Sequence, residues 1–215
     1  AKCTIATVYN NATRPTTCNI TTPANPYTLS SWNFNGWVNA GSGTTTSTTS
    51  GTAANGTMAI GGNVNIVATW KKEVTVTVTF DKNGGSANTT SAGVKTNIYN
   101  GATSLTGSLT FTAPSCTTRS GWNCLGYADR ASDTASEWNV GATKSISVAG
   151  LSVPIGNTTA SKASGYYHIW KNNNAGTQYT ATTKRNVSSA TGNDSSTAKC
   201  TIATVYNNAT RPTTC

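Results

Sequence analysis

Leucine, acidic residues, histidine and methionine are all scarce in this chain. Its 215 residues include five leucines, one methionine, one histidine and six acidic residues. No window carries the three- and four-residue apolar spacing of an amphipathic helix, and no apolar run is long enough to span a bilayer. Threonine, with 43 copies, is the commonest residue, and valine, isoleucine, tyrosine and tryptophan are plentiful, which favours strands. The composition therefore predicts a mainly β protein.

The same scarcity argues against catalysis and metal binding. His168 is the only histidine, it falls in an alternating strand pattern, and no nucleophile-elbow sequence is present. Asp129, Asp133 and Glu137 form the only acidic cluster, which is thin both for a glycosidase pair and for a calcium site. No cysteine cluster has zinc-ligand spacing. We therefore expect no enzyme activity, no cofactor and no metal.

The net charge of +9 reflects the lack of acids rather than a basic patch. The 15 lysines and arginines are scattered, with only two adjacent pairs, Lys71–Lys72 and Lys184–Arg185. Nucleic-acid-binding proteins concentrate such residues on one face and interleave them with aromatic residues. Specific nucleic-acid binding is therefore not expected, whereas weak, salt-sensitive attraction to surface glycans or acidic polymers is compatible with this charge.

An even number of cysteines, six, predicts disulfides and an oxidising, extracellular location. Cys3/Cys18 and Cys200/Cys215 are the same pair seen twice. A Cys3–Cys18 disulfide would tie the open ends of a hairpin and stabilise the fold by about 3 kcal/mol on the chain-entropy estimate. The predicted disulfide residues are Cys3, Cys18, Cys116, Cys124, Cys200 and Cys215.

An eighteen-residue segment, AKCTIATVYNNATRPTTC, occurs twice. Residues Ala1–Cys18 and Ala198–Cys215 are identical, which gives a period of 198 − 1 = 197 residues. Self-similarity at a fixed period is typical of arrays built from one recurring unit. An artificial duplication of one terminus is the alternative, but it does not explain a second, weaker repeat within the period.

That weaker repeat relates two modules of about half the period. Tyr9–Thr13 matches Tyr99–Thr103, and Trp70 matches Trp170. We therefore expect residues 1–72 to be the C-terminal part of a first-type module, 73–171 a complete second-type module, and 172–215 the N-terminal part of the next first-type module. Further matches are Pro23 with Pro114, and Trp32, Phe34, Gly36 and Trp37 with Trp122, Cys124, Gly126 and Tyr127.

Alternating apolar and polar residues mark the expected strands. A hairpin is predicted from residues 3–9 and 17–22 around a turn at 10–15, and a second one from 94–99 and 108–112 around Asn100-Gly101. The Gly/Ser/Thr-rich stretch 41–57 is predicted to be a flexible loop. Other strands are expected at 32–38, 63–70, 74–80, 122–128, 144–149 and 166–170.

These segments resemble the Listeria–Bacteroides repeat, also called the internalin B-repeat. VTFDKNGG at 78–85, WNFNGW at 32–37 with its variant WNCLGY at 122–127, EWNV at 137–140, and the closing tryptophans of 65–70 and 166–170 carry the resemblance. The resemblance implies tandem small β-grasp-like modules of four to six strands with little or no helix, in secreted bacterial surface proteins. It brings no catalytic residues with it. Tyr127, Thr183 and the cysteines depart from the general pattern.

The aromatic residues have two interpretations. In a sheet with few leucines, tryptophan and tyrosine must supply the buried apolar area, so core packing is predicted for Trp37, Trp70, Tyr127 and Trp170. Trp32, Trp122 and Trp138 are flanked by loops and are the candidates for stacking against sugar rings.

The strand predicted at 179–185 matches residues 76–82 of the complete module and is expected to join neighbouring repeats. Either the polypeptide continues, so that each module is completed by the next residues, or separate subunits complete one another by strand addition. The expected function is a structural module of an extracellular bacterial surface fibre, stalk or filament. The alternative is a multivalent glycan-binding adhesin module. The inter-repeat strand consists of Tyr179, Thr180, Ala181, Thr182, Thr183, Lys184 and Arg185.

Overall fold

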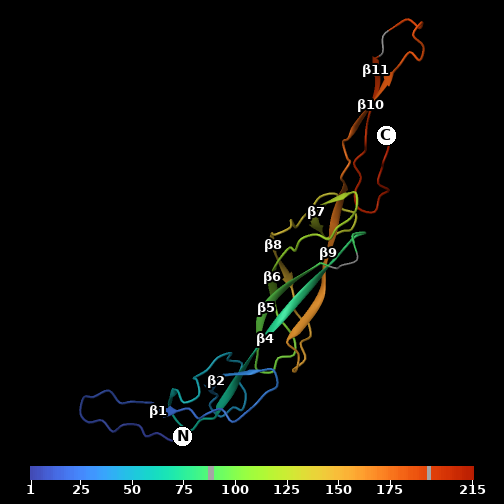
Figure 1. The fold of residues 1–215 in the computed structure, drawn as a ribbon. Coiled ribbons are helices and arrows are strands. Elements are labelled where there is room, and N and C mark those ends of the chain that lie inside the picture. The colour runs from blue at the N-terminus through green and yellow to red at the C-terminus, as the bar shows by residue number, and fades with distance from the viewer. Residues whose placement is uncertain (87–89, 193–194) are drawn as a thin grey trace. The chain divides into compact units, whose positions relative to one another are not determined.

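The protein is mainly β and disulfide-bonded, as the sequence predicts. A computed structural model describes residues 1–86, 90–192 and 195–215, without the side chains of 195–197. Within this part of the chain there are eleven strands and no helix (Figure 1). The strands are β1 (Cys18–Thr21), β2 (Asn33–Asn39), β3 (Thr57–Ile60), β4 (Ile66–Asp81), β5 (Ser91–Tyr99), β6 (Ser108–Thr112), β7 (Trp122–Ala128), β8 (Thr143–Ser147), β9 (Thr159–Asn172), β10 (Gln178–Thr183) and β11 (Ser195–Thr201).

One five-stranded sheet and three two-stranded sheets contain these strands. The large sheet has the order β2-β4-β9-β7, with β5 also paired to β4, and the small sheets are β1-β3, β6-β8 and β10-β11. Disulfides join Cys3 to Cys18, Cys116 to Cys124 and Cys200 to Cys215. Such bonds persist in oxidising compartments. None of the described residues forms a helix that could cross a membrane.

Strand β4 is one continuous strand of 16 residues, not the two strands predicted at 63–70 and 74–80. From Val74 onward the inward positions Val74, Val76, Val78 and Phe80 are at most 1% exposed. The period of two that predicted the strand therefore also defines its buried face. Residues 70–74 (WKKEV), which include the predicted module boundary at residue 72, lie within this strand. Lys72 points inward in this strand, and its ammonium group has two carbonyl acceptors there.

The buried ammonium of Lys72 has specific partners. Its Nζ donates to the carbonyls of Pro154 and Ile155 at 3.0 and 2.9 Å and lies 4.8 Å from the ring centroid of Trp32. Burial lowers the pKa of Lys72. A charge is tolerated at this inward position because each of its donors has an acceptor or a π-face.

The chain forms two compact units. The first contains residues 1–76, 94–108 and 147–160, and the second contains 77–93, 109–146 and 161–215. Neither unit is continuous in sequence, and the stretch 73–171 contributes to both. The module boundaries at residues 72 and 171 follow the sequence repeat and stay predictions.

The predicted N-terminal hairpin is not formed. Residues 3–9 contain no strand, and β1 pairs antiparallel with β3 instead, with Ile20 opposite Met58. Ile20 is buried in this pairing, and Thr22, directly after β1, is also buried, with its hydroxyl donating to the Ala53 carbonyl at 2.6 Å. β1 therefore pairs with the distant strand β3 rather than with residues 3–9, because this pairing buries side chains that the hairpin would leave exposed.

The second predicted hairpin is also wrong, although its turn forms. Asn100 has a φ of 51°, as the turn requires. The two strands then separate, because β5 pairs with β4 and β6 pairs with β8. Leu105 and Phe111 on the returning segment are 3% and 0% exposed. The strand pairing that buries these side chains replaces the hairpin.

Both modules contain the same irregularity in the aromatic strand. In β2 the register against β4 shifts between Phe34 and Trp37, and in β7 the register against β9 shifts between Cys124 and Gly126. Trp37 then forms an isolated bridge with Thr52, and Tyr127 one with Trp138. The sequence match between the modules is thus a match of backbone geometry. Of the predicted loop 41–57, residues 41–56 contain no strand apart from this bridge, whereas Thr57 is the first residue of β3.

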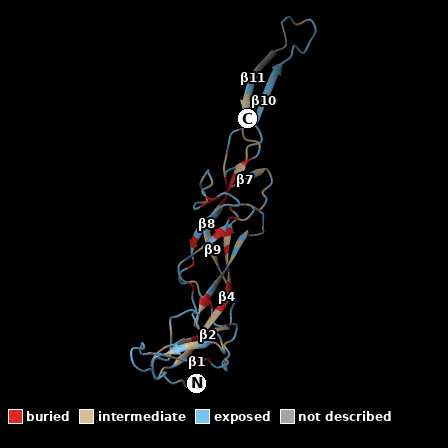
Figure 2. Ribbon diagram, turned by 90° about the vertical axis from the view of Figure 1, so that its left-hand side faces the viewer, coloured by how far each residue is buried: buried red, intermediate tan, exposed pale blue. Residues whose placement is uncertain are grey.

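The anchors of the two aromatic rings also correspond. The Trp37 Nε1 donates to the carbonyl of Pro23 at 2.9 Å, and the Tyr127 hydroxyl donates to that of Pro114 at 3.1 Å. These are the two prolines that the sequence comparison paired. Figure 2 shows the buried residues on β4, β8 and β9, whereas β10 is exposed along its length.

Candidate assembly interface

The C-terminal copy of the repeated segment is part of the second unit and contacts the rest of that unit through Asn207. This residue is 4% exposed. Its backbone N–H donates to the Trp170 carbonyl, and its Oδ1 accepts from the Trp170 N–H, both at 2.9 Å. Its Nδ2 donates to the carbonyl of Asp133 at 2.6 Å. We call the reciprocal pair of bonds between one asparagine and one tryptophan backbone the asparagine clasp.

Asn172 makes a second set of contacts with the same segment. It is 1% exposed. Its Oδ1 accepts from the Val205 N–H and its Nδ2 donates to the Ala203 carbonyl, both at 2.9 Å. Ile202 is 2% exposed beside these bonds. The segment therefore satisfies a buried amide at the end of β9, which would be costly to leave unpaired.

Polar contacts continue past the clasp. The Arg119 Nη1 donates to the carbonyl of Asn207 at 2.5 Å, and its guanidinium carbon lies 4.2 Å from the ring centroid of Trp122. Burial lowers the pKa of Arg119, but a guanidinium stays charged at neutral pH. Further bonds run from Asn208 Nδ2 to Asn83 Oδ1 at 3.1 Å, from Asn174 Nδ2 to the Pro212 carbonyl at 2.7 Å, and from Arg211 Nη2 to Asn173 Oδ1 at 3.0 Å.

An equivalent clasp is present in the first unit. The Asn100 N–H donates to the Trp70 carbonyl at 2.9 Å, and Asn100 Oδ1 accepts from the Trp70 N–H at 3.0 Å. Asn100 and Asn207 are the aligned positions of the two modules, and Asn10 is the third. The sequence showed this alignment but not the role of the asparagines. A Tyr-Asn pair does not predict a hydrogen bond to the backbone of a tryptophan that is distant in the sequence.

The N-terminal copy of the segment has the same turn, but no clasp joins its asparagine to a tryptophan among the residues that the structure describes. Asn10 and Asn207 have φ values of 55° and 53°. Side chains 4–14 are all exposed, with Ile5 at 41% and Tyr9 at 78%. Ile202, the equivalent of Ile5, is 2% exposed. One sequence is therefore found in two environments, docked in one copy and solvated in the other.

The predicted inter-repeat strand lies in the β10-β11 ribbon. β10 pairs antiparallel with β11, with Tyr179 opposite Cys200. All of its side chains are exposed, Tyr179 at 52%. The matching strand in the complete module is the part of β4 whose inward side chains are at most 1% exposed. Five of the predicted residues, Tyr179–Thr183, are in β10, and Lys184 and Arg185 follow it.

Three of the four predicted core aromatics are deeply buried. Trp37, Tyr127 and Trp170 are 4%, 0% and 1% exposed, whereas Trp70 is only half-buried. The Trp170 Nε1 donates to the carbonyl of Lys82 at 3.0 Å, just after β4. The sequence repeat matches Lys82 with Arg185, and it therefore predicts that a strand of the 172–215 type covers Trp70 in the same way.

Two of the three predicted sugar-stacking residues are buried, so the prediction is wrong for them. Trp32 is 6% exposed and lies beside the Lys72 ammonium, and Trp138 is 2% exposed. Ring contacts with Phe80 and Tyr166, each at 5.3 Å between centroids, cover Trp138. Trp122 is half-buried and one face of it carries the Arg119 guanidinium. Flanking loops in the sequence did not reveal these side chains that cover the rings.

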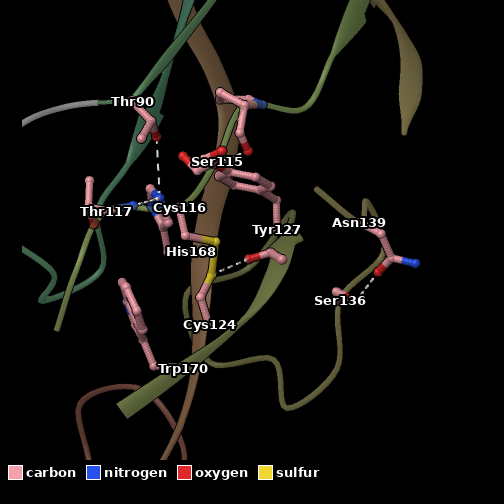
Figure 3. The surroundings of a disulfide bond; sticks show 12 residues. Thr90, Ser115, Cys116, Thr117, Cys124, Tyr127, Ser136, Asn139, His168 and Trp170 are labelled. Carbon is pink, nitrogen blue, oxygen red and sulfur yellow. Dashed lines mark hydrogen bonds between the residues drawn. A yellow bond between two sulfur atoms is a disulfide. The ribbon is translucent and has the colours of Figure 1, made fainter. Parts of the chain in front are cut away.

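His168 is buried beside the Cys116–Cys124 disulfide (Figure 3). Its ring lies 4.8 Å from that of Tyr127 and stacks on Trp170 at 5.6 Å. Nδ1 is 2.7 Å from the Asp81 carbonyl and must therefore donate to it. Nε2 then accepts, at 3.4 Å from the Thr117 N–H and 3.3 Å from the Thr90 hydroxyl. Burial lowers the pKa of His168, and the hydrogen bond to the Asp81 carbonyl raises it by a smaller amount.

The stability of the protein is expected to fall on mild acidification through His168. The unfolded chain takes up a proton near the ordinary histidine pKa of 6.5, whereas the folded chain does so only at lower pH. Since the unfolded state then binds more protons, the free energy of unfolding decreases as pH falls below about 6.5. Urea titrations between about pH 7 and 5 should show this slope, and His168→Gln should flatten it. An unchanged slope in this variant would contradict the assignment.

The three acidic side chains lie close together, but they do not form a buried, well-coordinated metal site. One carboxylate oxygen each of Asp129, Asp133 and Glu137 lies within 4.8 Å of the others, and the side chains are exposed or half-exposed. Glu137 Oε2 already accepts from the Asp129 N–H at 3.2 Å. Exposed carboxylates of this kind are common without an ion, and the cluster carries no functional conclusion.

Comparisons of the chain with family models, with curated proteins and with solved structures found no match.

Proposed function

We propose that this chain is a structural repeat of an extracellular bacterial surface fibre, stalk or filament, in which each repeat is completed by its neighbour. One observation carries the proposal. Residues 202–212 of the shared segment contact the rest of the second unit, whereas the side chains of residues 5–14 in the identical N-terminal copy are exposed. A neighbouring repeat would offer the solvated copy the surface that the docked copy already uses.

The two copies use different parts of the shared segment. In the N-terminal copy, the ends contribute to the first unit, because Cys3 is bonded to Cys18 and Cys18 pairs with Ile60 in β1-β3. In the C-terminal copy, residues 202–212 make the contacts with the second unit. These two sets of contacts are compatible. A single segment could hold the second unit of one repeat and the first unit of the next at the same time.

The exposed ribbon and the half-buried Trp70 support the same assignment. β10 repeats the pattern of a strand whose inward residues are buried elsewhere in the chain. Disulfides that close both copies of the segment suit a fibre exposed to an oxidising medium. The resemblance to surface-protein repeats is in keeping with this function. Glycan binding has less support, because Trp32 and Trp138 have no free face.

A chain of two periods tests the proposal. It would carry residues 1–197 followed by 1–215, with Thr210→Ser in the internal shared segment as a mass label at an exposed position. In hydrogen exchange, the internal copy should be as protected as the C-terminal copy, and the N-terminal copy should exchange rapidly. Negative-stain images should show particles that lengthen with the number of periods.

The opposite outcome is equally clear. An internal copy that exchanges as fast as the N-terminal one, in a chain that does not lengthen, would contradict a repeat completed by its neighbour. Material isolated from the native source provides an independent check, since its mass should correspond to many periods of 197 residues (198 − 1).

A further inference from the structure

The second unit presents a surface that recognises the repeated segment by its backbone and its asparagine. We call it the acceptor surface. It comprises the side chains of Asn83, Arg119, Asn172 and Asn174 and the main chain of Asp133 and Trp170. Its contacts go to main-chain groups of the segment or to asparagine side chains. Any chain that offers the same eighteen residues in the same turn satisfies all of them.

A second copy of the protein offers them at its N-terminus. Residues 5–15 there are identical to 202–212, and Asn10 already has the φ of a clasping asparagine, 55° against 53°. The backbone turn is similar too, since the Ala12 N–H lies 3.4 Å from the Tyr9 carbonyl and the Ala209 N–H 3.1 Å from that of Tyr206. The donor is thus largely pre-organised, which lowers the entropic cost of docking.

We propose that the acceptor surface is a self-recognition site that takes residues 5–15 of a second copy in place of residues 202–212, so that separate chains join head to tail without a covalent bond between them. This inference rests on the proposed function and extends it, because it gives the array a route to assemble from subunits. The partner is this chain itself, and the clasp residue of the donor is Asn10.

Residues 202–212 of the same chain compete with residues 5–15 of a second copy for the acceptor surface, and this competition sets the protein concentration at which exchange occurs. The C-terminal segment is tethered, so it occupies its own acceptor surface at an effective concentration on the order of millimolar. A second copy at about ten micromolar is then at a disadvantage of roughly 100-fold. Weakening the tethered segment alone removes that disadvantage, and the two identical copies can be mutated independently.

The experiment uses the full chain and the variant Asn207→Gly. Glycine keeps the positive φ and removes the side-chain bonds to Trp170 and Asp133, which should weaken docking by roughly 10- to 100-fold. Light scattering after size exclusion should then show oligomers at concentrations lower by about that factor than for the unmodified chain. Asn10→Gly alone is the matched control and should remain like the unmodified chain. The double variant should return to the monomer.

A labelled, disulfide-closed peptide of residues 1–18 provides a second readout. It should bind Asn207→Gly at least about 10-fold more tightly than the same peptide carrying Asn10→Gly, since only the first can form the clasp. If Asn207→Gly folds poorly, Asn208→Ala removes a single bond to Asn83 and should give the same pattern with a smaller shift.

Two results would overturn the inference. One is a folded Asn207→Gly chain that stays monomeric and does not bind the peptide, and the other is oligomers that persist in the double variant. If the two-period chain nevertheless protects its internal segment, repeats are completed only along one polypeptide, and the proposed function stands. If that protection is also missing, the proposed function fails as well.

Discussion

Trp138→Ala should lower the free energy of unfolding by about 3–5 kcal/mol, the usual cost of removing a buried tryptophan. The indole is 2% exposed, and its ring centroid lies 5.3 Å from that of Phe80 and 6.3 Å from that of Tyr127. Its Nε1 donates to the Ala142 carbonyl at 2.8 Å. The substitution therefore opens a cavity in the core of the second unit and also leaves that carbonyl without its side-chain donor.

Trp122→Ala is the matched control, because it removes the same side chain from a half-buried position under Arg119. It should cost about 1–2 kcal/mol, mainly from the part of the indole that is buried and from a cation–π contact. Urea denaturation of both variants under non-reducing conditions, followed by fluorescence, measures the difference. Equal losses in the two variants would mean that Trp138 is not a core residue in solution.

Gly36→Ala is expected to be comparably damaging in the first unit, although it adds only one methyl group. The residue has a φ of 110°, and a Cβ there would lie 2.5 Å from the carbonyl carbon of Gly51. Backbone strain of about 1–3 kcal/mol and a similar cost of displacing a packed main chain add to about 2–6 kcal/mol. The bulge in β2 and the bridge between Trp37 and Thr52 should loosen together.

Gly156→Ala provides the comparison, because its Cβ would meet nothing within 4 Å and its φ lies outside the left-handed region. Its effect should stay within about 1 kcal/mol and can be slightly stabilising, since alanine restricts the unfolded chain. Thermal unfolding by circular dichroism can rank the two variants. A Gly36→Ala chain as stable as Gly156→Ala would show that the close approach to Gly51 does not exist in solution.

The sequence determined the strands because their signal is local. Strict alternation at residues 74–80 predicted both a strand and its buried face, and the side chains Val74, Val76 and Val78 are fully buried. An even number of cysteines in a chain with one histidine predicted disulfides, and three are present. The match between the aromatic strands predicted a shared geometry, which appears as equivalent bulges at Gly36 and Gly126.

Strand partners could not be predicted in the same way, because they depend on contacts far apart in the sequence. Both local hairpins were expected from good turn signals, yet β1 pairs with β3 and β6 pairs with β8. Each exchange buries apolar side chains, Ile20 in one case and Phe111 in the other. Burial of this kind outweighs a turn preference of a fraction of a kcal/mol.

The repeated segment shows most directly which properties the sequence determines and which the tertiary structure decides. Its sequence alone established the period and the expectation of a neighbouring repeat, because eighteen identities need no structure to be recognised. Only the tertiary structure decided that Asn207 is a clasp on Trp170 while Asn10 is solvated, since identical residues differ solely in the surface within their reach. The local turn is encoded in the segment, but what it binds is set by groups such as Asn172 and Arg119, which lie elsewhere in the chain.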